Sequence, residues 1–250
     1  MHIFFHVPKA AGTTFREMLR LQISPGKVLN LQGSGGISFM TDDDLNSMDL
    51  ISGHVGIDLL KRIHRPYVSI TMLRDPVSRV VSQYRYIRGQ AKEGRRYYFS
   101  SNRWLTLSLS DVLRDEDPFI DSTFRNTQAW FFTSDWPATS RDRSLCDQNV
   151  LDRAKENIER LDYFGIVEEL DLSYRAMNRK FHWALVNNAW LNRSEGDELE
   201  LTPELVELIQ SENRLDVELY AWAKKRFYEK TEQIFADGRF ANVLAKWIGD

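Results

Sequence analysis

The first residues that could do chemistry form the segment Pro8–Thr14, which contains a lysine, two alanines, a glycine and two threonines. A short apolar run, Ile3–Val7, precedes it and predicts a buried strand, and the apolar residues that follow it are spaced as on one face of a helix. The first turn of a helix presents unpaired backbone N–H groups and the positive end of the helix dipole. A small-residue loop between a strand and a helix therefore predicts a phosphate-binding site.

The order of residues in this loop differs from that of a P-loop kinase, in which the lysine follows the glycines. Here Lys9 precedes Gly12. An ordinary strand-to-helix turn is the alternative interpretation. For the helix start, Thr14 and Glu17 have the spacing of a capping box, and Thr13 is an equally good N-cap.

A second candidate phosphate site follows the β-rich run Tyr67–Leu73, which predicts a strand buried on both faces of a parallel sheet. Arg74 comes at the carboxyl end of this strand, where ligands of doubly wound sheets bind. Asp75 and Pro76 predict the N-cap and the first residue of a helix that also carries Ser82. An arginine with a serine hydroxyl suits a terminal phosphate. The alternative is that Arg74 only caps the strand and that Ser82 is solvated.

Two segments together resemble the phosphate motifs of carbohydrate sulfotransferases, such as the heparan sulfate 2-O- and 6-O-sulfotransferases. They are the sequence F-H-V-P-K-A-A-G-T-T-F and the R-D-P segment with its helical serine. The resemblance implies transfer of a sulfuryl group from 3′-phosphoadenosine-5′-phosphosulfate (PAPS) to a hydroxyl of a glycan or polysaccharide, with adenosine 3′,5′-bisphosphate as product. It implies that Lys9 contacts the bridging oxygen and is catalytic. Ala10 departs from the motif, because many members carry threonine there. The nucleotide-binding residues that the resemblance implies are Lys9, Ala11, Gly12, Thr13, Thr14, Arg74 and Ser82.

Sulfuryl transfer also needs a base for the acceptor hydroxyl, and histidine suits this task because its ordinary pKa lies near neutral pH. His54 follows Gly53 at the end of a predicted strand, and it resembles the histidine of the G-H-V element in heparan sulfate 2-O-sulfotransferases. We therefore predict that His54 is the catalytic base, with an acid limb of activity near pH ~6.5. A structural histidine is the alternative for His54, and His6 is the competing base.

Two segments are candidates for the acceptor side. Arg125 and Gln128 belong to an R-N-x-Q element on a predicted helix and are our predicted substrate-binding residues. An exposed polar helix face would explain them nearly as well. The stretch Arg85–Arg103 mixes arginines with tyrosines, which suits an anionic or glycan acceptor or a solvated charged loop.

The remaining patterns predict one domain over residues 1–250 with a P-loop-like α/β fold, in which three layers place a central parallel sheet between helices. Further strands are predicted at Asp49–Val55 and Tyr163–Val167, helices at Asp121–Phe132 and Asp147–Leu161, a mostly helical segment at Thr202–Trp247 and a loop at Leu31–Phe39.

Composition argues against several function classes. The net charge of −3 lacks the basic field of a nucleic-acid binder. One cysteine, and five histidines without the spacing of a zinc helix, predict no disulfide framework and no metal. No apolar stretch approaches the length of a membrane span. The heparan enzymes are anchored Golgi proteins, often with disulfides, and since this sequence shows neither feature we expect a cytoplasmic enzyme.

Two other function classes remain as alternatives. A small-molecule ATP-dependent kinase of P-loop type would need magnesium ligands and a lysine after the glycines of the loop. A non-catalytic glycan-binding protein could share the fold, but it would not need both phosphate motifs.

Overall fold

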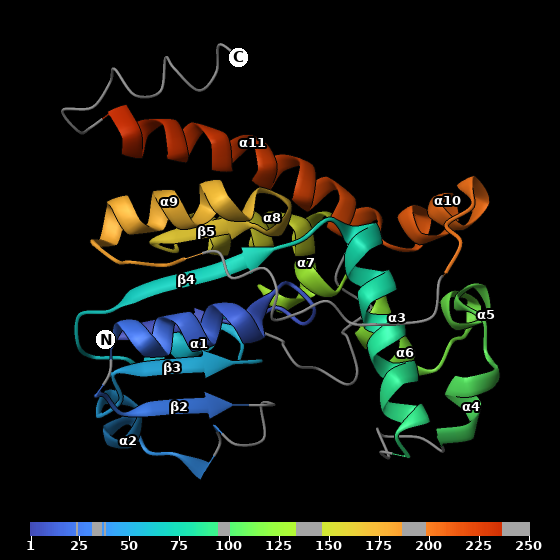
Figure 1. The fold of residues 1–250 in the computed structure, drawn as a ribbon, viewed down its shortest axis with the longest axis horizontal. Coiled ribbons are helices and arrows are strands. Elements are labelled where there is room, and N and C mark those ends of the chain that lie inside the picture. The colour runs from blue at the N-terminus through green and yellow to red at the C-terminus, as the bar shows by residue number, and fades with distance from the viewer. Residues whose placement is uncertain are drawn as a thin grey trace.

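The fold of the chain is seen in a computed structural model, which describes residues 1–23, 25–31, 37, 39–94, 101–133, 147–186 and 199–236. Its centre is a five-stranded sheet in the order β2-β3-β1-β4-β5, in which all neighbouring strands are parallel (Figure 1). The strands are β1 (His2–Phe5), β2 (Val28–Leu31), β3 (Leu50–Gly53), β4 (Val68–Leu73) and β5 (Tyr163–Ile166).

Helices flank this sheet, and α3 stands beside the carboxyl ends of the strands (Figure 1). The predicted fold class, an α/β fold with a central parallel sheet flanked by helices, is confirmed. The helices are α1 (Gly12–Gln22), α2 (Asp42–Asn46), η2 (Ile57–Arg62), α3 (Pro76–Lys92), α4 (Ser101–Thr106), α5 (Leu109–Arg114), α6 (Pro118–Phe124), α7 (Thr127–Phe131), α8 (Asp147–Glu159), η3 (Val167–Glu169), α9 (Leu170–Phe181), α10 (Pro203–Glu212) and α11 (Arg214–Ala236).

The central strand β1 is buried because its residues are apolar in succession, as a strand covered on both faces requires. Ile3, Phe4 and Phe5 are fully buried. Phe5 pairs with Gly53 of β3 on one side and with Thr71 of β4 on the other. Because these three strands end close together at one edge of the sheet, the loops that follow them are brought together there.

The edge strand β2 was not predicted, and Leu31, placed in a predicted loop, is its last residue. Its four residues are too few and too exposed to give a clear pattern. Gly53 lets β2 and β3 approach, because a Cβ atom at Gly53 would lie 1.9 Å from the carbonyl oxygen of Leu31. The position therefore accepts only glycine.

The predicted helix Asp121–Phe132 is wrong, because the chain forms two short helices, α6 and α7, with a break between them. Asn126 lies in the break with φ at +46°, a left-handed conformation. The buried Arg79 of α3 donates to the carbonyl oxygens of Thr123 (3.3 Å) and Phe124 (2.8 Å), which end α6. A side chain distant in sequence thus stabilises the helix end.

Two apolar clusters form the core. The larger surrounds the sheet, and the smaller lies among α3, α4, α5, α6 and α10, with Trp104 and Phe124 stacked inside it. The mostly helical C-terminal segment is confirmed as α10 and α11 through Ala236, and 237–250 lie outside the described residues. One domain over 1–250 stays a prediction.

Candidate active site

The loop after β1 has a backbone that small residues tolerate best. Lys9 (φ +65°) and Ala11 (φ +56°) both adopt the left-handed conformation, and α1 begins at Gly12. The predicted threonine cap is wrong: Ala11 is the N-cap residue, no side chain caps α1, and Glu17 instead binds Arg16 and Arg20. Left-handed backbone at non-glycine residues often accompanies function.

The consequence is a helix start that is open to an anion. The N–H of Phe15 donates to the carbonyl oxygen of Ala11 at the start of α1. The N–H groups that come before Phe15 in the first turn lie ahead of the regular hydrogen bonds of the helix. Thr13 is exposed beside them, and the buried hydroxyl of Thr14 has no hydrogen-bond partner among the described residues. These features suit a phosphate at the N-terminus of α1.

Gly12 is required at the helix start because the His6 ring lies against it. A Cβ atom at Gly12 would be 1.8 Å from Cδ2 of His6. Burial, followed by the neighbouring His54, lowers the pKa of His6 to about 3, so its ring is neutral at pH 7. His6 is thus a packed, uncharged side chain under the loop.

Lys9 places its charge over an aromatic ring at the same loop. Its Nζ lies 4.0 Å from the centre of the Tyr86 ring on α3. Within the part of the chain that the structure describes, no carboxylate pairs with it. Burial, followed by the charge of Arg74, lowers the pKa of Lys9 to about 8. A cation held in this way gains most from an anionic ligand.

Arg74 joins the loop after β1 to the end of β4. Its Nη1 donates to the carbonyl oxygen of Lys9 at 3.0 Å. Its Nε is buried without a hydrogen-bond partner among the described residues and lies 4.0 Å from a carboxylate oxygen of Glu168. Burial lowers the pKa of Arg74, which nevertheless stays charged. Because Nε is buried and faces Glu168, a further anion would have to meet the partly exposed remainder of the guanidinium.

Glu168, two residues after the end of β5, is a site residue that the sequence analysis missed. It accepts the N–H of Asp75 at 3.1 and 3.2 Å and the hydroxyl of Tyr220 at 2.8 Å. Its place at a strand end was the signal that could have revealed it. Asp75 caps α3 through the N–H of Ser78, and Pro76 is the first residue of α3, as predicted. Ser82 lies partly exposed on the same helix.

The two predicted acceptor-binding residues both have partners within the protein. Arg125 binds Glu212 (2.7 Å), Asp121 (3.3 Å) and the carbonyl oxygen of Leu113 (2.6 Å). The Gln128 side chain bonds to the backbone of Arg74. These contacts give both residues roles in the fold, and contact with an acceptor stays a prediction.

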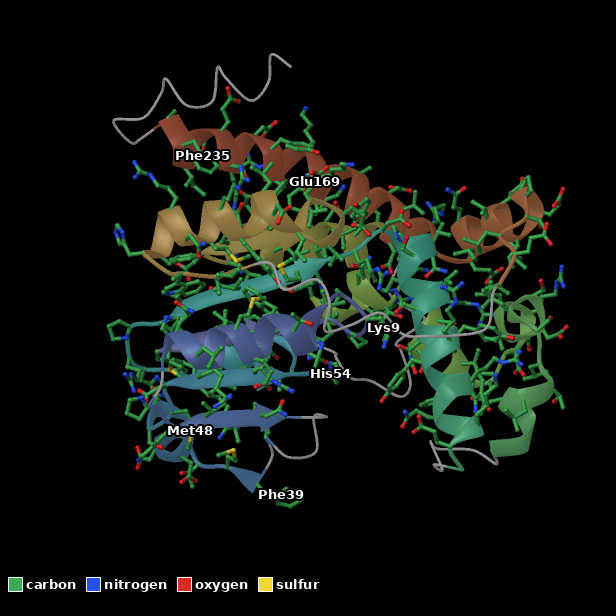
Figure 2. All side chains as sticks on the ribbon, in the orientation of Figure 1. Lys9, Phe39, Met48, His54, Glu169 and Phe235 are labelled. Atoms are coloured by element: carbon green, nitrogen blue, oxygen red, sulfur yellow. The ribbon has the colours of Figure 1, made fainter. Side chains whose placement is uncertain are left out.

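His54 lies at the same edge of the sheet as Lys9 (Figure 2). Its Nδ1 is 2.6 Å from the carbonyl oxygen of His6, and the two rings are 4.6 Å apart. Because a carbonyl only accepts, Nδ1 carries the hydrogen and Nε2 has a lone pair for another proton. Burial lowers the pKa of His54, with further contributions from Arg16 and Lys9. The ring is therefore neutral at pH 7, the state that a base requires.

The basic and aromatic stretch divides between α3, which continues to Lys92, and α4, while 95–100 lie outside the described residues. Across the described ranges, no group of three or more His, Cys, Asp or Glu side chains is arranged to hold a metal ion. None of the helices described is long and apolar enough to cross a membrane. That the reaction uses no metal stays a prediction.

The fold and this edge define a class of protein: an α/β protein with a candidate anion site at the carboxyl ends of its central parallel strands. Comparison with known proteins narrows the class. The profile of the sulfotransferase family matches residues 2–223. The chain therefore belongs to the sulfotransferase family and is a sulfotransferase.

The similar curated proteins are about a quarter identical to this chain over the aligned segments. Heparan-sulfate 6-O-sulfotransferase 2 of Gallus gallus is 25% identical over 91% of this chain and 67% of its own length. Heparan-sulfate 6-O-sulfotransferase 3-B of Danio rerio is 24% identical over 66% of this chain and 44% of its own length. Heparan-sulfate 6-O-sulfotransferase 2 of Homo sapiens is 24% identical over 69% of this chain and 31% of its own length. The chain thus spans two thirds or less of these relatives.

Proposed function

We propose that this sulfotransferase transfers the sulfuryl group of PAPS to a hydroxyl of a carbohydrate. The observation that carries the proposal is the bond between Arg74 and the carbonyl of Lys9, because it joins the two phosphate motifs at neighbouring strand ends. A nucleotide with phosphates at both its 5′ and 3′ positions needs two anion sites. The similarity to heparan-sulfate 6-O-sulfotransferases supports a carbohydrate acceptor.

In the proposed complex, the 5′-phosphosulfate lies at the N-terminus of α1. The N–H groups of Gly12, Thr13 and Thr14 face its oxygens, and Lys9 approaches the oxygen that bridges phosphorus and sulfur. As the bond from sulfur to this oxygen breaks, negative charge grows on the phosphate. A lysine that already faces the oxygen stabilises this charge without reorganising.

The acceptor side of the reaction falls to His54. The acceptor oxygen forms a bond to sulfur in line with the departing oxygen, and its proton moves to Nε2 of His54. The bond from Nδ1 to the His6 carbonyl keeps Nε2 facing away from that carbonyl and stabilises the imidazolium that forms. Adenosine 3′,5′-bisphosphate and the sulfated acceptor then leave.

Arg74 and Ser82 are proposed to bind the 3′-phosphate, which distinguishes PAPS from ATP and AMP. The first test is thermal unfolding with adenosine 3′,5′-bisphosphate, ATP and AMP. At 100 times its dissociation constant, the bound nucleotide stabilises the protein by about 2.7 kcal/mol. Equal stabilisation by all three nucleotides would contradict a 3′-phosphate site.

The second test concerns the acceptor. Radiolabelled PAPS is supplied with a heparin-type polysaccharide and, as the matched non-carbohydrate acceptor, with p-nitrophenol. We expect label in the polysaccharide and little in the phenol. Transfer to the phenol alone would remove carbohydrate from the proposal and leave the sulfotransferase chemistry in place. A cytoplasmic location is a separate proposal, to be tested by cell fractionation with the native gene.

A further inference from the structure

The Gln128 side chain bonds to both backbone groups of one residue, Arg74. Its Oε1 accepts the N–H of Arg74 at 2.9 Å, and its Nε2 donates to the carbonyl oxygen of Arg74 at 2.7 Å. Gln128 is 1% exposed. The amide keeps one further lone pair and one further N–H, but its burial leaves them little access to solvent.

A buried network holds Gln128 in turn. Asp216 of α11 accepts the N–H groups of Gln128 (3.1 Å) and Ala129 (2.8 Å) at the start of α7. The Arg79 guanidinium lies 3.7 Å from the Asp216 carboxylate, and both side chains are fully buried. The orientation of α7, and of the amide it carries, is therefore set by a charge pair in the core.

A second pair of bonds fastens α7 to α11. The amide oxygen of Asn126 accepts the N–H groups of Leu215 (2.9 Å) and Asp216 (3.3 Å). The N–H of Asn126 donates to the side chain of Asn213 at 2.9 Å. Gln128 thus projects from a helix start that is bonded on both sides, and it reaches the end of β4.

We propose that Gln128 is a positioning residue, which holds the backbone of Arg74 so that the guanidinium faces the 3′-phosphate and so sets the preference for a 3′-phosphorylated nucleotide. The inference rests on the proposed function of Arg74. Beyond β4, the sheet no longer pairs the backbone of Arg74, and the side-chain amide replaces that pairing. The N–H of Asp75, in the same peptide group as the Arg74 carbonyl, donates to Glu168. The peptide groups on both sides of the Arg74 Cα are therefore bonded to side chains.

The test is the ratio of the dissociation constants of AMP and adenosine 3′,5′-bisphosphate, measured by calorimetry. Gln128→Met keeps the length of the side chain and removes both bonds. Asn178→Leu is the matched control, because Asn178 holds the backbone of Leu185 from both sides in the same way (2.9 and 2.7 Å) at the far end of α9. The loss of unfolding free energy in both variants measures the general effect of removing two side-chain hydrogen bonds to the backbone of one residue.

We expect Gln128→Met to lower the ratio about tenfold or more, since small misplacements of a binding group are costly, while AMP affinity changes less than about threefold. Asn178→Leu should keep the wild-type ratio. A wild-type ratio in Gln128→Met overturns the inference, as does an equal loss for AMP. A wild-type protein without preference for the 3′-phosphate overturns the role of Arg74 and, with it, this inference.

A second variant decides the question if Gln128→Met does not fold. Gln128→Glu keeps the shape and the acceptor for the Arg74 N–H but loses the donor to the Arg74 carbonyl. We expect the ratio in Gln128→Glu to fall below that of the wild type. An unchanged ratio in Gln128→Glu at pH 7.5 would contradict the proposal, because the carboxylate then faces a carbonyl oxygen and cannot hold it.

Discussion

The pKa of Lys9 makes nucleotide affinity depend on pH in a range where few other groups titrate. Burial and Arg74 lower this pKa to about 8 in the free protein. A phosphosulfate at the loop needs the charged lysine, so binding selects the protonated form. Affinity should therefore fall as the pH rises through about 8 and should be fully present below it.

The size of the fall follows from the fraction of charged Lys9. With a pKa of about 8, roughly nine tenths of the lysine is charged at pH 7 and roughly one tenth at pH 9, so the apparent dissociation constant should rise about tenfold. Near pH 8, binding should take up about half a proton, because about half of the lysine is neutral beforehand. The ligand phosphates, with a second pKa of about 6, are already charged throughout.

The assay is calorimetry with adenosine 3′,5′-bisphosphate from pH 7 to pH 9.5 at constant ionic strength, in buffers of different ionisation enthalpy. Lys9→Arg is the matched control, since guanidinium keeps its charge over this range, and its affinity should stay nearly constant. Lys9→Met should bind weakly at every pH. An equal fall in Lys9→Arg and the wild type would refute the assignment, as would a wild-type affinity unchanged between pH 7 and pH 9.

Three further outcomes are expected. His54→Ala should lower turnover by about 10²–10⁴-fold with little change in nucleotide affinity. The acid limb of wild-type activity should lie below pH ~6.5, because burial lowers the pKa of His54. An active variant with the same acid limb would show that another residue is the base. Gly12→Ala should lower the free energy of unfolding in urea by about 1–3 kcal/mol, since the added methyl group meets the His6 ring. An unchanged midpoint would show that the His6 ring moves aside at no cost. Asp216→Asn should lower the free energy of unfolding by about 3–5 kcal/mol, because it leaves the buried Arg79 guanidinium without its countercharge. Asp147→Asn, which removes a charge from an exposed ion pair, should lower it by less than about 1 kcal/mol. Similar losses in the two variants would argue against the buried pair.

The sequence was informative where chemistry lies in a continuous segment. Lys9 and Gly12 follow a strand and precede a helix, and Arg74 follows another strand, so each motif could be recognised with no knowledge of the other. Parallel strands then bring their carboxyl ends together by necessity. The direction of the acid limb did not follow in the same way, because the burial that lowers the pKa of His54 is a property of the folded protein.

Local patterns failed where distant groups took over a local role. The spacing of Thr14 and Glu17 suggested a cap, but the left-handed Ala11 begins α1 and leaves its first turn open. The predicted helix through Asn126 breaks because Arg79 occupies the carbonyl groups at the end of α6. At the end of α6, the bonds from the buried Arg79 outweigh the weak local preference for one continuous helix.

The sequence by itself determined the family motifs, the parallel sheet and the edge at which Lys9, His54 and Arg74 meet. Only the tertiary structure showed the contacts of Gln128: the side chain that we predict to bind the acceptor also bonds to the backbone of Arg74. The physical reason is that a motif in one segment records which groups are available, whereas the partners of a buried amide or charge are chosen by packing. Asp216 and Arg79 meet in the core because neither could be buried alone.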